Sequence, residues 1–186
     1  MTTNLRHFLH LQCNYSLSLA SKREIAIKME EQRFLDIINH NQQIIYKVCY
    51  MYATDNDHFK DLYQEILINL WQGLERFRGD AQLSTWIYRI CINTCVTYFR
   101  RNHRHDETLT LDAVKEVPDV ASNRSEELKE MYILISRLRK LDKAIILMWL
   151  DEKSCDEIAE VTGLTRNNVA SRLHRIKAKL VEYSQE

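Results

Sequence analysis

The chain has 186 residues, of which 45% are apolar and 28% are charged, and its 26 basic side chains balance its 26 acidic ones. This composition excludes a disordered chain, and the lack of any run of about 18 apolar residues excludes a transmembrane helix and direct membrane insertion. Only three glycines and one proline are present. So few turn-forming residues are unfavourable for many short strands, and we therefore predict an all-α fold.

The cysteines and the charge distribution further restrict the class of protein that the sequence can encode. The five cysteines form no C-x-x-C pair and have no histidine pair at zinc spacing; they are Cys13, Cys49, Cys91, Cys95 and Cys155. We expect buried, reduced thiols in a cytoplasmic protein, with no metal and no cofactor. The neutral net charge is an average, because Thr165–Val181 carries only basic charges whereas acids cluster over Ser125–Glu160.

Four segments follow one another along the chain. Residues 1–28 are predicted to be a disordered extension, or a stretch upstream of a true start at Met29; polar residues interrupt Phe8–Ala20 and argue against a signal peptide. Residues 29–105 and 125–186 are predicted to be two small helical domains. Residues 106–124 contain Pro118 and scattered acids, which predicts a flexible linker, with an irregular loop packed on one domain as the alternative.

The first domain is predicted to begin with a helix over Glu30–Ala53 that is bent or broken near Asn39–Asn41. A second helix over Phe59–Phe77 follows the capping cluster Thr54–Asp57 and ends at a C-cap in Arg78–Asp80. Its core stripe lies beside a second, acidic and apolar line of Asp61, Gln64, Glu65, Ile68 and Gln72. Because free solvent does not favour an isoleucine there, this line predicts a partner-binding face; Trp71 is more consistent with the core.

A third helix over Ser84–Arg101 has a buried side and a basic side. The buried stripe is predicted to be Ile87, Ile90, Cys91, Thr94 and Tyr98. The opposite side carries a basic, amide-rich ridge of Arg89, Asn93, Thr97, Arg100 and Arg104. This ridge suits an anionic backbone, and Trp86 and Tyr88 can stack on exposed bases; a core position is the alternative for Trp86.

The second domain ends in two short helices joined by a glycine turn. Ser154 and Glu157 form a capping box, Gly163 makes the corner, and Thr165 caps the last helix. Ala159 lets the two helices approach, and Val169 anchors the second to the core. These features predict a helix-turn-helix over residues 155–174, in a four-helix, winged-helix-like domain. The outward face carries arginines and asparagines that suit DNA, although a solvated basic face would look the same.

These motifs resemble those of a known family. The segments DLYQE at Asp61–Glu65, LW at Leu70–Trp71, FRGD at Phe77–Asp80 and STWIYRI at Ser84–Ile90, with Asn93 after them, are similar to the second conserved region of bacterial RNA polymerase sigma factors. The segments EIA at Glu157–Ala159, GL at Gly163–Leu164 and SRL at Ser171–Leu173 are similar to the fourth region. With no further domain between them, the chain resembles the small extracytoplasmic-function subfamily.

The resemblance implies three binding surfaces. The second helix would bind the clamp coiled coil of the largest polymerase subunit, through Asp61, Leu62, Gln64, Glu65, Ile68, Trp71 and Gln72, and the chain would also meet the polymerase flap. The −10 promoter element would be bound by Arg78, Trp86, Arg89, Asn93, Arg100, Arg101 and Arg104. The −35 element would be read by Arg166, Asn167, Asn168, Ser171, Arg172, Arg175 and Lys179. The linker would run toward the RNA exit path, and an anti-sigma factor, often membrane-anchored in the family, would hold the chain inactive.

Two departures from the family pattern concern the second domain. Leu141–Asp142 replaces the usual Leu-Pro, which alters a helix start. Asn167–Ser171 replaces the usual Gly-Thr-Val-Lys-Ser, so that Ala170 takes the place of a lysine suited to a phosphate. A −35 sequence therefore cannot be transferred from other members.

Two other classes of function were considered. A stand-alone helix-turn-helix regulator would bind DNA without polymerase, but it gives no reason for the acidic and apolar line at Asp61–Gln72. An enzyme is disfavoured, because the sequence has no Gly-rich phosphate loop, paired acid and base, or nucleophile elbow.

Overall fold

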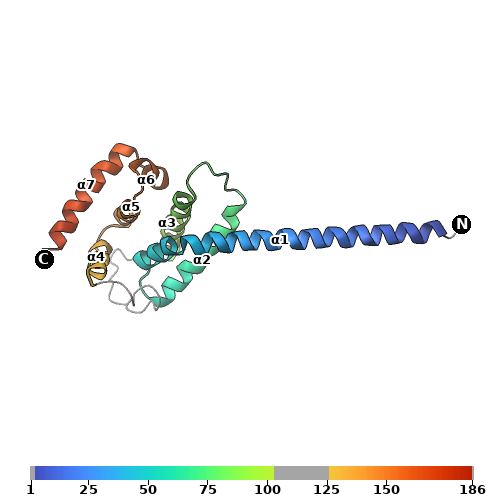
Figure 1. The fold of residues 1–186 in the computed structure, drawn as a ribbon. Coiled ribbons are helices and arrows are strands. Elements are labelled where there is room, and N and C mark those ends of the chain that lie inside the picture. Colours follow the sequence, from blue (N-terminus) through green and yellow to red (C-terminus); the bar gives the residue numbers. More distant parts are fainter. Residues whose placement is uncertain (1–2, 103–125, 186) are drawn as a thin grey trace. The chain divides into compact units, whose positions relative to one another are not determined.

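The structure is a computed structural model that describes residues 3–102 and 126–185, with the backbone alone for residues 3–22, 102 and 126. Its regular elements are the α-helices α1 to α7 (Figure 1). Among the described residues there is no β-strand, so the all-α prediction is confirmed. The two predicted helical regions are also confirmed, whereas the predicted linker 106–124 lies outside the described residues.

Helix α1 runs without interruption from Thr3 to Tyr52. The structure therefore differs from the predicted break near Asn39–Asn41, whereas the predicted bounds and disorder of the N-terminal extension 1–28 stay a prediction. The physical reason is that no glycine or proline lies between Thr3 and Tyr52, so the backbone has no point at which the helix must stop. The chain forms two compact units, residues 1–40 and 41–186, and the predicted binding surfaces belong to the second.

The α2–α3 hairpin carries the core of the N-terminal helical region. Helix α2 (Asn56–Leu74) begins at Asp55, whose carboxylate accepts the amide N–H of His58, and buries Phe59, Leu62, Ile66 and Leu70. It ends one turn earlier than predicted, and Gly79 lies in the following loop at φ +79° rather than at a helix cap. Helix α3 (Leu83–Asn102) follows and buries apolar residues along its length: Ile87, Tyr88, Cys91, Ile92, Cys95 and Phe99.

Four described cysteines carry free thiols, as the sequence predicts. Cys49, Cys91 and Cys95 are buried, and burial raises the pKa of each thiol, that of Cys49 to about 12. Cys155 is half-buried. The three buried thiols therefore stay protonated and act as small apolar side chains at neutral pH.

The C-terminal helical region consists of α4 (Glu126–Ser136), α5 (Lys140–Leu150), α6 (Cys155–Thr162) and α7 (Arg166–Tyr183). The predicted caps of α6 and α7 are confirmed. The Ser154 hydroxyl accepts the N–H of Glu157, the Glu157 carboxylate accepts the N–H of Ser154, and the Thr165 hydroxyl accepts the N–H of Asn168. Gly163 ends α6 in the left-handed conformation.

Helices α5 and α6 are the elements through which the two helical regions meet. Residues 143–148 of α5 are all buried, and this helix contacts α3 as well as α6 and α7. The Tyr52 hydroxyl at the end of α1 donates to the carbonyl of Lys140 over 2.6 Å. Beside it, the Lys143 ammonium reaches the carbonyl of Met51 at 3.4 Å.

Lys143 is a buried cation at this contact, and replacing it should stabilise the fold. Its side chain is 4% exposed, and burial, reinforced by the positive charge of Lys140, lowers its pKa to about 8. Removing the ion by Lys143→Met should raise the free energy of unfolding at pH 7 by about 1–3 kcal/mol. Urea unfolding monitored by circular dichroism measures this change.

The same pKa gives the stability difference a pH dependence. Above about pH 8 the folded chain loses the Lys143 proton while the unfolded chain keeps it, so the stability of the wild-type chain rises relative to Lys143→Met. The difference between the two proteins should therefore shrink from about pH 7 to about pH 9. A constant difference would show that Lys143 is not desolvated.

Candidate nucleic-acid and polymerase interface

The outward line on α2 is accessible to a partner. Asp61, Gln64 and Gln72 are exposed, Glu65 is half-buried, and Ile68 and Trp71 are 51% and 42% exposed. The expectation that Trp71 belongs to the core is therefore wrong. Leu62, assigned to the polymerase contact on resemblance, is fully buried in the chain's own core and cannot form part of the surface, because it lies on the opposite face of the helix.

Helix α3 presents only part of its predicted ridge to solvent. Asn93, Arg100 and Arg101 are exposed, and Arg78 is exposed in the preceding loop. Arg89 forms an ion pair with Glu160 of α6. Arg104 lies outside the described residues.

The two aromatic residues near the start of α3 have different environments. Tyr88 is fully buried, and its hydroxyl donates to the carboxylate of Asp151, so the prediction that it stacks on bases is wrong. Trp86 is half-buried, with its ring centroid 5.0 Å from that of Phe77. A Cβ atom added at Gly73 would lie 3.0 Å from the Trp86 ring, so the glycine makes room for the indole.

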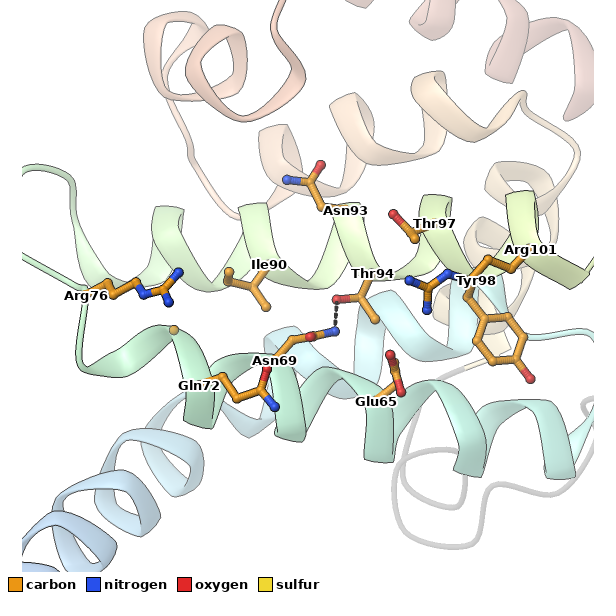
Figure 2. A pocket seen from close by; sticks show the side chains of 11 residues that line it. Glu65, Asn69, Gln72, Arg76, Ile90, Asn93, Thr94, Thr97, Tyr98 and Arg101 are labelled. Carbon is orange, nitrogen blue, oxygen red and sulfur yellow. Dashed lines mark hydrogen bonds between the residues drawn. The ribbon is translucent and has the colours of Figure 1, made fainter.

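A pocket of about 410 Å³ lies between α2 and α3, and Figure 2 shows the side chains that line it. The Asn69 amide donates to the Thr94 hydroxyl across it over 3.0 Å. Arg76 and Arg101 lie toward opposite ends of the view. The pocket joins two predicted surfaces, because Glu65 and Gln72 from the α2 line and Asn93 and Thr97 from the α3 ridge all line it.

Asn69 and Arg76 line this pocket but are absent from the sequence-based set. A signal for them exists in the sequence. Asn69 lies on one stripe of α2 with Glu65 and Gln72, and Arg76 follows at helical spacing just beyond the end of the helix.

The helix-turn-helix places the predicted −35 residues on the outer side of α7. Arg166, Asn167, Asn168, Ser171, Arg175 and Lys179 are exposed, and Arg172 is half-buried. Val169, Leu173 and Ile176 hold the other side of α7 in the core. The Arg172 guanidinium donates to Asp142 over 2.8 Å, so the departure at Leu141–Asp142 provides a partner for an arginine of the predicted −35 set.

Glu157 of α6 is the most strongly perturbed carboxylate of the described residues. Burial opposes its charge, but hydrogen bonds from Thr85, Ser154 and Lys153 outweigh this and lower its pKa to about 2. The Thr85 hydroxyl, on a fully buried residue of α3, donates to Glu157 over 2.7 Å. Glu157 therefore caps its own helix and joins it to α3.

The fold contains a helix-turn-helix and a separate basic helix, which are typical of a DNA-binding transcription protein. The exposed acidic and apolar line on α2 adds a face that suits a protein partner. Two family models match the chain: Sigma-70 region 2 over residues 37–105, and Sigma-70, region 4 over residues 128–180. The chain belongs to the sigma-70 family of RNA polymerase sigma factors, in its extracytoplasmic-function branch, and it directs the initiation of transcription. Members of this family are not enzymes, and neither is this chain.

Similar proteins cover most of the chain. RNA polymerase sigma factor SigV of Bacillus subtilis (strain 168) is 26% identical over 155 residues, which are 80% of this chain and 90% of that protein. ECF RNA polymerase sigma-E factor of Escherichia coli (strain K12) is 28% identical over 164 residues, 81% of this chain and 85% of that protein.

Solved structures share the fold. The sigma factor RpoE from Bartonella quintana, in complex with the anti-sigma factor NepR, has a TM-score of 0.66 at 21% identity and covers 83% of this chain and 96% of its own. CnrH, in complex with the cytosolic domain of CnrY, has a TM-score of 0.60 at 18% identity and covers 83% of this chain and 89% of its own. Within the described residues of this chain, no helix is long and apolar enough to span a membrane, and no cluster of metal-ligating side chains is found.

Gly163 forms the turn between α6 and α7, and its left-handed backbone conformation can be tested by substitution. Its φ of +71° is unfavourable for an L-residue, and no atom lies within 4 Å of an added Cβ, so the cost of a substitution is backbone strain. Gly163→Ala should lower the free energy of unfolding by about 1–2 kcal/mol, while Gly163→Asn, which tolerates this region, should lower it less. Equal losses in urea unfolding would show that strain is not the cause.

Proposed function

We propose that this sigma factor binds core RNA polymerase through the exposed line on α2, contacts the −10 promoter element through α3 and its preceding loop, and reads the −35 element through α7. The observation that carries the proposal is the presence, in one unit, of an accessible acidic and apolar face and of two helices with exposed basic side chains. A stand-alone regulator would need the two basic surfaces but not the exposed Ile68 beside Asp61 and Gln64.

The polymerase clamp is the partner that fits the α2 line. Asp61 and Glu65 supply negative charge, and Ile68 and Trp71 supply apolar area one and two turns further along. Such a face, with charges at one end and exposed apolar area beside them, suits a protein–protein contact. Contact with the polymerase flap is proposed for the C-terminal helical region on the family resemblance.

The DNA surfaces divide into base-reading and phosphate-binding parts. Arg166, Asn167 and Asn168 lie at the start of α7, where side chains reach base edges in a major groove. Arg172, Arg175 and Lys179 lie further along and suit phosphates. Exposed polar and basic side chains on α3 and in the loop before it suit the backbone of a melted strand: Arg78, Asn93, Arg100 and Arg101. The half-buried Trp86 leaves part of its ring accessible for stacking on a base.

An anti-sigma factor is the regulator that fits this protein. Two solved structures of similar fold are complexes of this kind: one holds the anti-sigma factor NepR, and the other holds the cytosolic domain of CnrY. A partner of this class would hold the chain away from polymerase in the cytoplasm, where we place its action.

Charge reversal on α2 tests the polymerase contact. Asp61→Lys with Glu65→Lys should weaken binding to purified core polymerase by at least about tenfold, because two complementary charges become repulsive. Glu75→Lys is the matched control, since it changes an exposed acid beyond the end of the same helix. Core binding is measured by fluorescence anisotropy, with circular dichroism to verify the helices. Equal affinities for both variants would contradict the assignment.

Truncation on α7 tests the −35 contact. Arg175→Ala should weaken binding of the polymerase complex to duplex promoter DNA by a similar factor for all sequences and should reduce the salt slope by about one. Lys60→Ala removes an exposed charge from α2 as a control. A change in base preference would show that Arg175 reads bases instead of phosphates.

A further inference from the structure

A polar strip without arginine or lysine runs along the outward side of α7. Asn167, Ser171 and His174 are exposed and lie at i, i+4 and i+7, on the side of the helix opposite its buried residues. A helix in the major groove points its outermost side chains at the base pairs. The strip would therefore face base edges, and contact with phosphates falls to the two flanks of the helix.

Cations lie on both flanks of this strip. A helix in the major groove has one sugar–phosphate backbone on each side, so each flank meets phosphates. At roughly 100° per residue, Arg172 and Lys179 lie on one flank, and Arg166 and Lys177 lie on the other. The second flank also carries Ala170 in the place of the family's lysine. Its positive charge therefore comes from Arg166 and Lys177.

The side-chain partners of these flank cations differ in charge. Arg172 and Arg166 each face a carboxylate, at 2.8 Å and 3.6 Å. The Lys177 ammonium instead lies 3.6 Å from the centroid of the Trp149 ring, near the end of α5. A carboxylate compensates the charge of its arginine, whereas the indole is neutral. Lys177 therefore has a fixed partner and keeps its full positive charge.

The ring places this charge before any anion arrives. A lysine side chain that moves freely loses rotamer freedom when it binds a phosphate, and this loss weakens the contact. Trp149 holds the ammonium over one face of the indole and leaves its N–H groups on the far side free to donate to an anion. Trp149 is 40% exposed and Lys177 is exposed, so the pair is accessible to DNA.

We propose that Lys177 binds a phosphate of the −35 element and that Trp149 is its positioning residue. This inference rests on the proposed function of α7 and adds a second backbone to it. Arg172 and Lys179 bind phosphates on one side of the groove, Lys177 binds on the other, and the strip that includes His174 lies over the base pairs between them.

Removing the lysine tests the phosphate contact. The full chain in complex with core polymerase is titrated with a fluorescein-labelled promoter duplex, and with versions of it that carry single substitutions in the −35 element, at several KCl concentrations. Lys177→Ala should weaken binding of all these duplexes by a similar factor, about threefold or more, and should reduce the salt slope by about one. An unchanged slope, or a change in base preference, overturns the role of Lys177.

Lys140→Ala is the matched control. Lys140 is also an exposed lysine stacked on an aromatic ring, with its ammonium 4.2 Å from the centroid of Phe99, but it lies at the start of α5 and outside α7. This variant should leave the salt slope unchanged. An equal reduction of the slope by both variants would show that the effect is not specific to the flank of α7, and it would overturn the proposal.

Tryptophan variants test the positioning role. Trp149→Ala should weaken promoter binding by about threefold in the chain that has Lys177, because the ammonium must then be ordered on binding, and it should have no further effect in the Lys177→Ala chain. Trp149→Phe, which keeps a ring under the ammonium, should restore most of the affinity. Circular dichroism verifies that each variant is folded. If Trp149→Ala weakens binding equally with and without Lys177, the ring acts by another route and the positioning role is overturned.

Arg175→Ala distinguishes failure of this inference from failure of the proposed function. If Arg175→Ala weakens promoter binding and Lys177→Ala does not, the role of Lys177 is overturned while the −35 assignment of α7 stands. If neither variant changes promoter binding, the −35 assignment of α7 fails, and the role of Lys177 fails with it.

Discussion

Helix α3 is a core element and also carries one of the proposed binding surfaces, and this constraint decides where its charged residues can lie. Ile87, Cys91, Cys95 and Phe99 fix one side of the helix in the interior. That leaves a narrow outward side, and its N-terminal half is shared with α6 through Thr85 and Arg89. The remaining outward residues line the pocket between α3 and α2, as far as Arg101 near the end of α3.

Local signals made much of the fold predictable. The caps at Ser154 and Thr165 and the left-handed Gly163 depend on neighbours within a few residues, so the sequence determines α6 and α7 without help from distant contacts. The misassigned positions depend on distant contacts. Tyr88 is typical of a stacking residue until its hydroxyl meets Asp151, 63 positions away. Periodicity alone likewise did not predict that Trp71 would be exposed, since an aromatic residue suits either face of α2.

The neutral net charge of the chain reflects acids of the C-terminal helical region that pair with arginines of the same chain. Three arginines of the proposed DNA surfaces lie beside carboxylates of the same chain: Arg89 beside Glu160, Arg166 beside Asp156, and Arg172 beside Asp142. In this chain of balanced charge, part of the proposed DNA surfaces is therefore compensated by the chain's own acids.

The central claim is that one chain couples polymerase to promoter DNA through separate surfaces. The most direct test is to map the 5′ ends of transcripts made by purified core polymerase on genomic DNA, with and without the chain. The account predicts a discrete set of start sites that appear only when the chain is present and share two upstream elements. DNA binding by the chain without any new start site would contradict it.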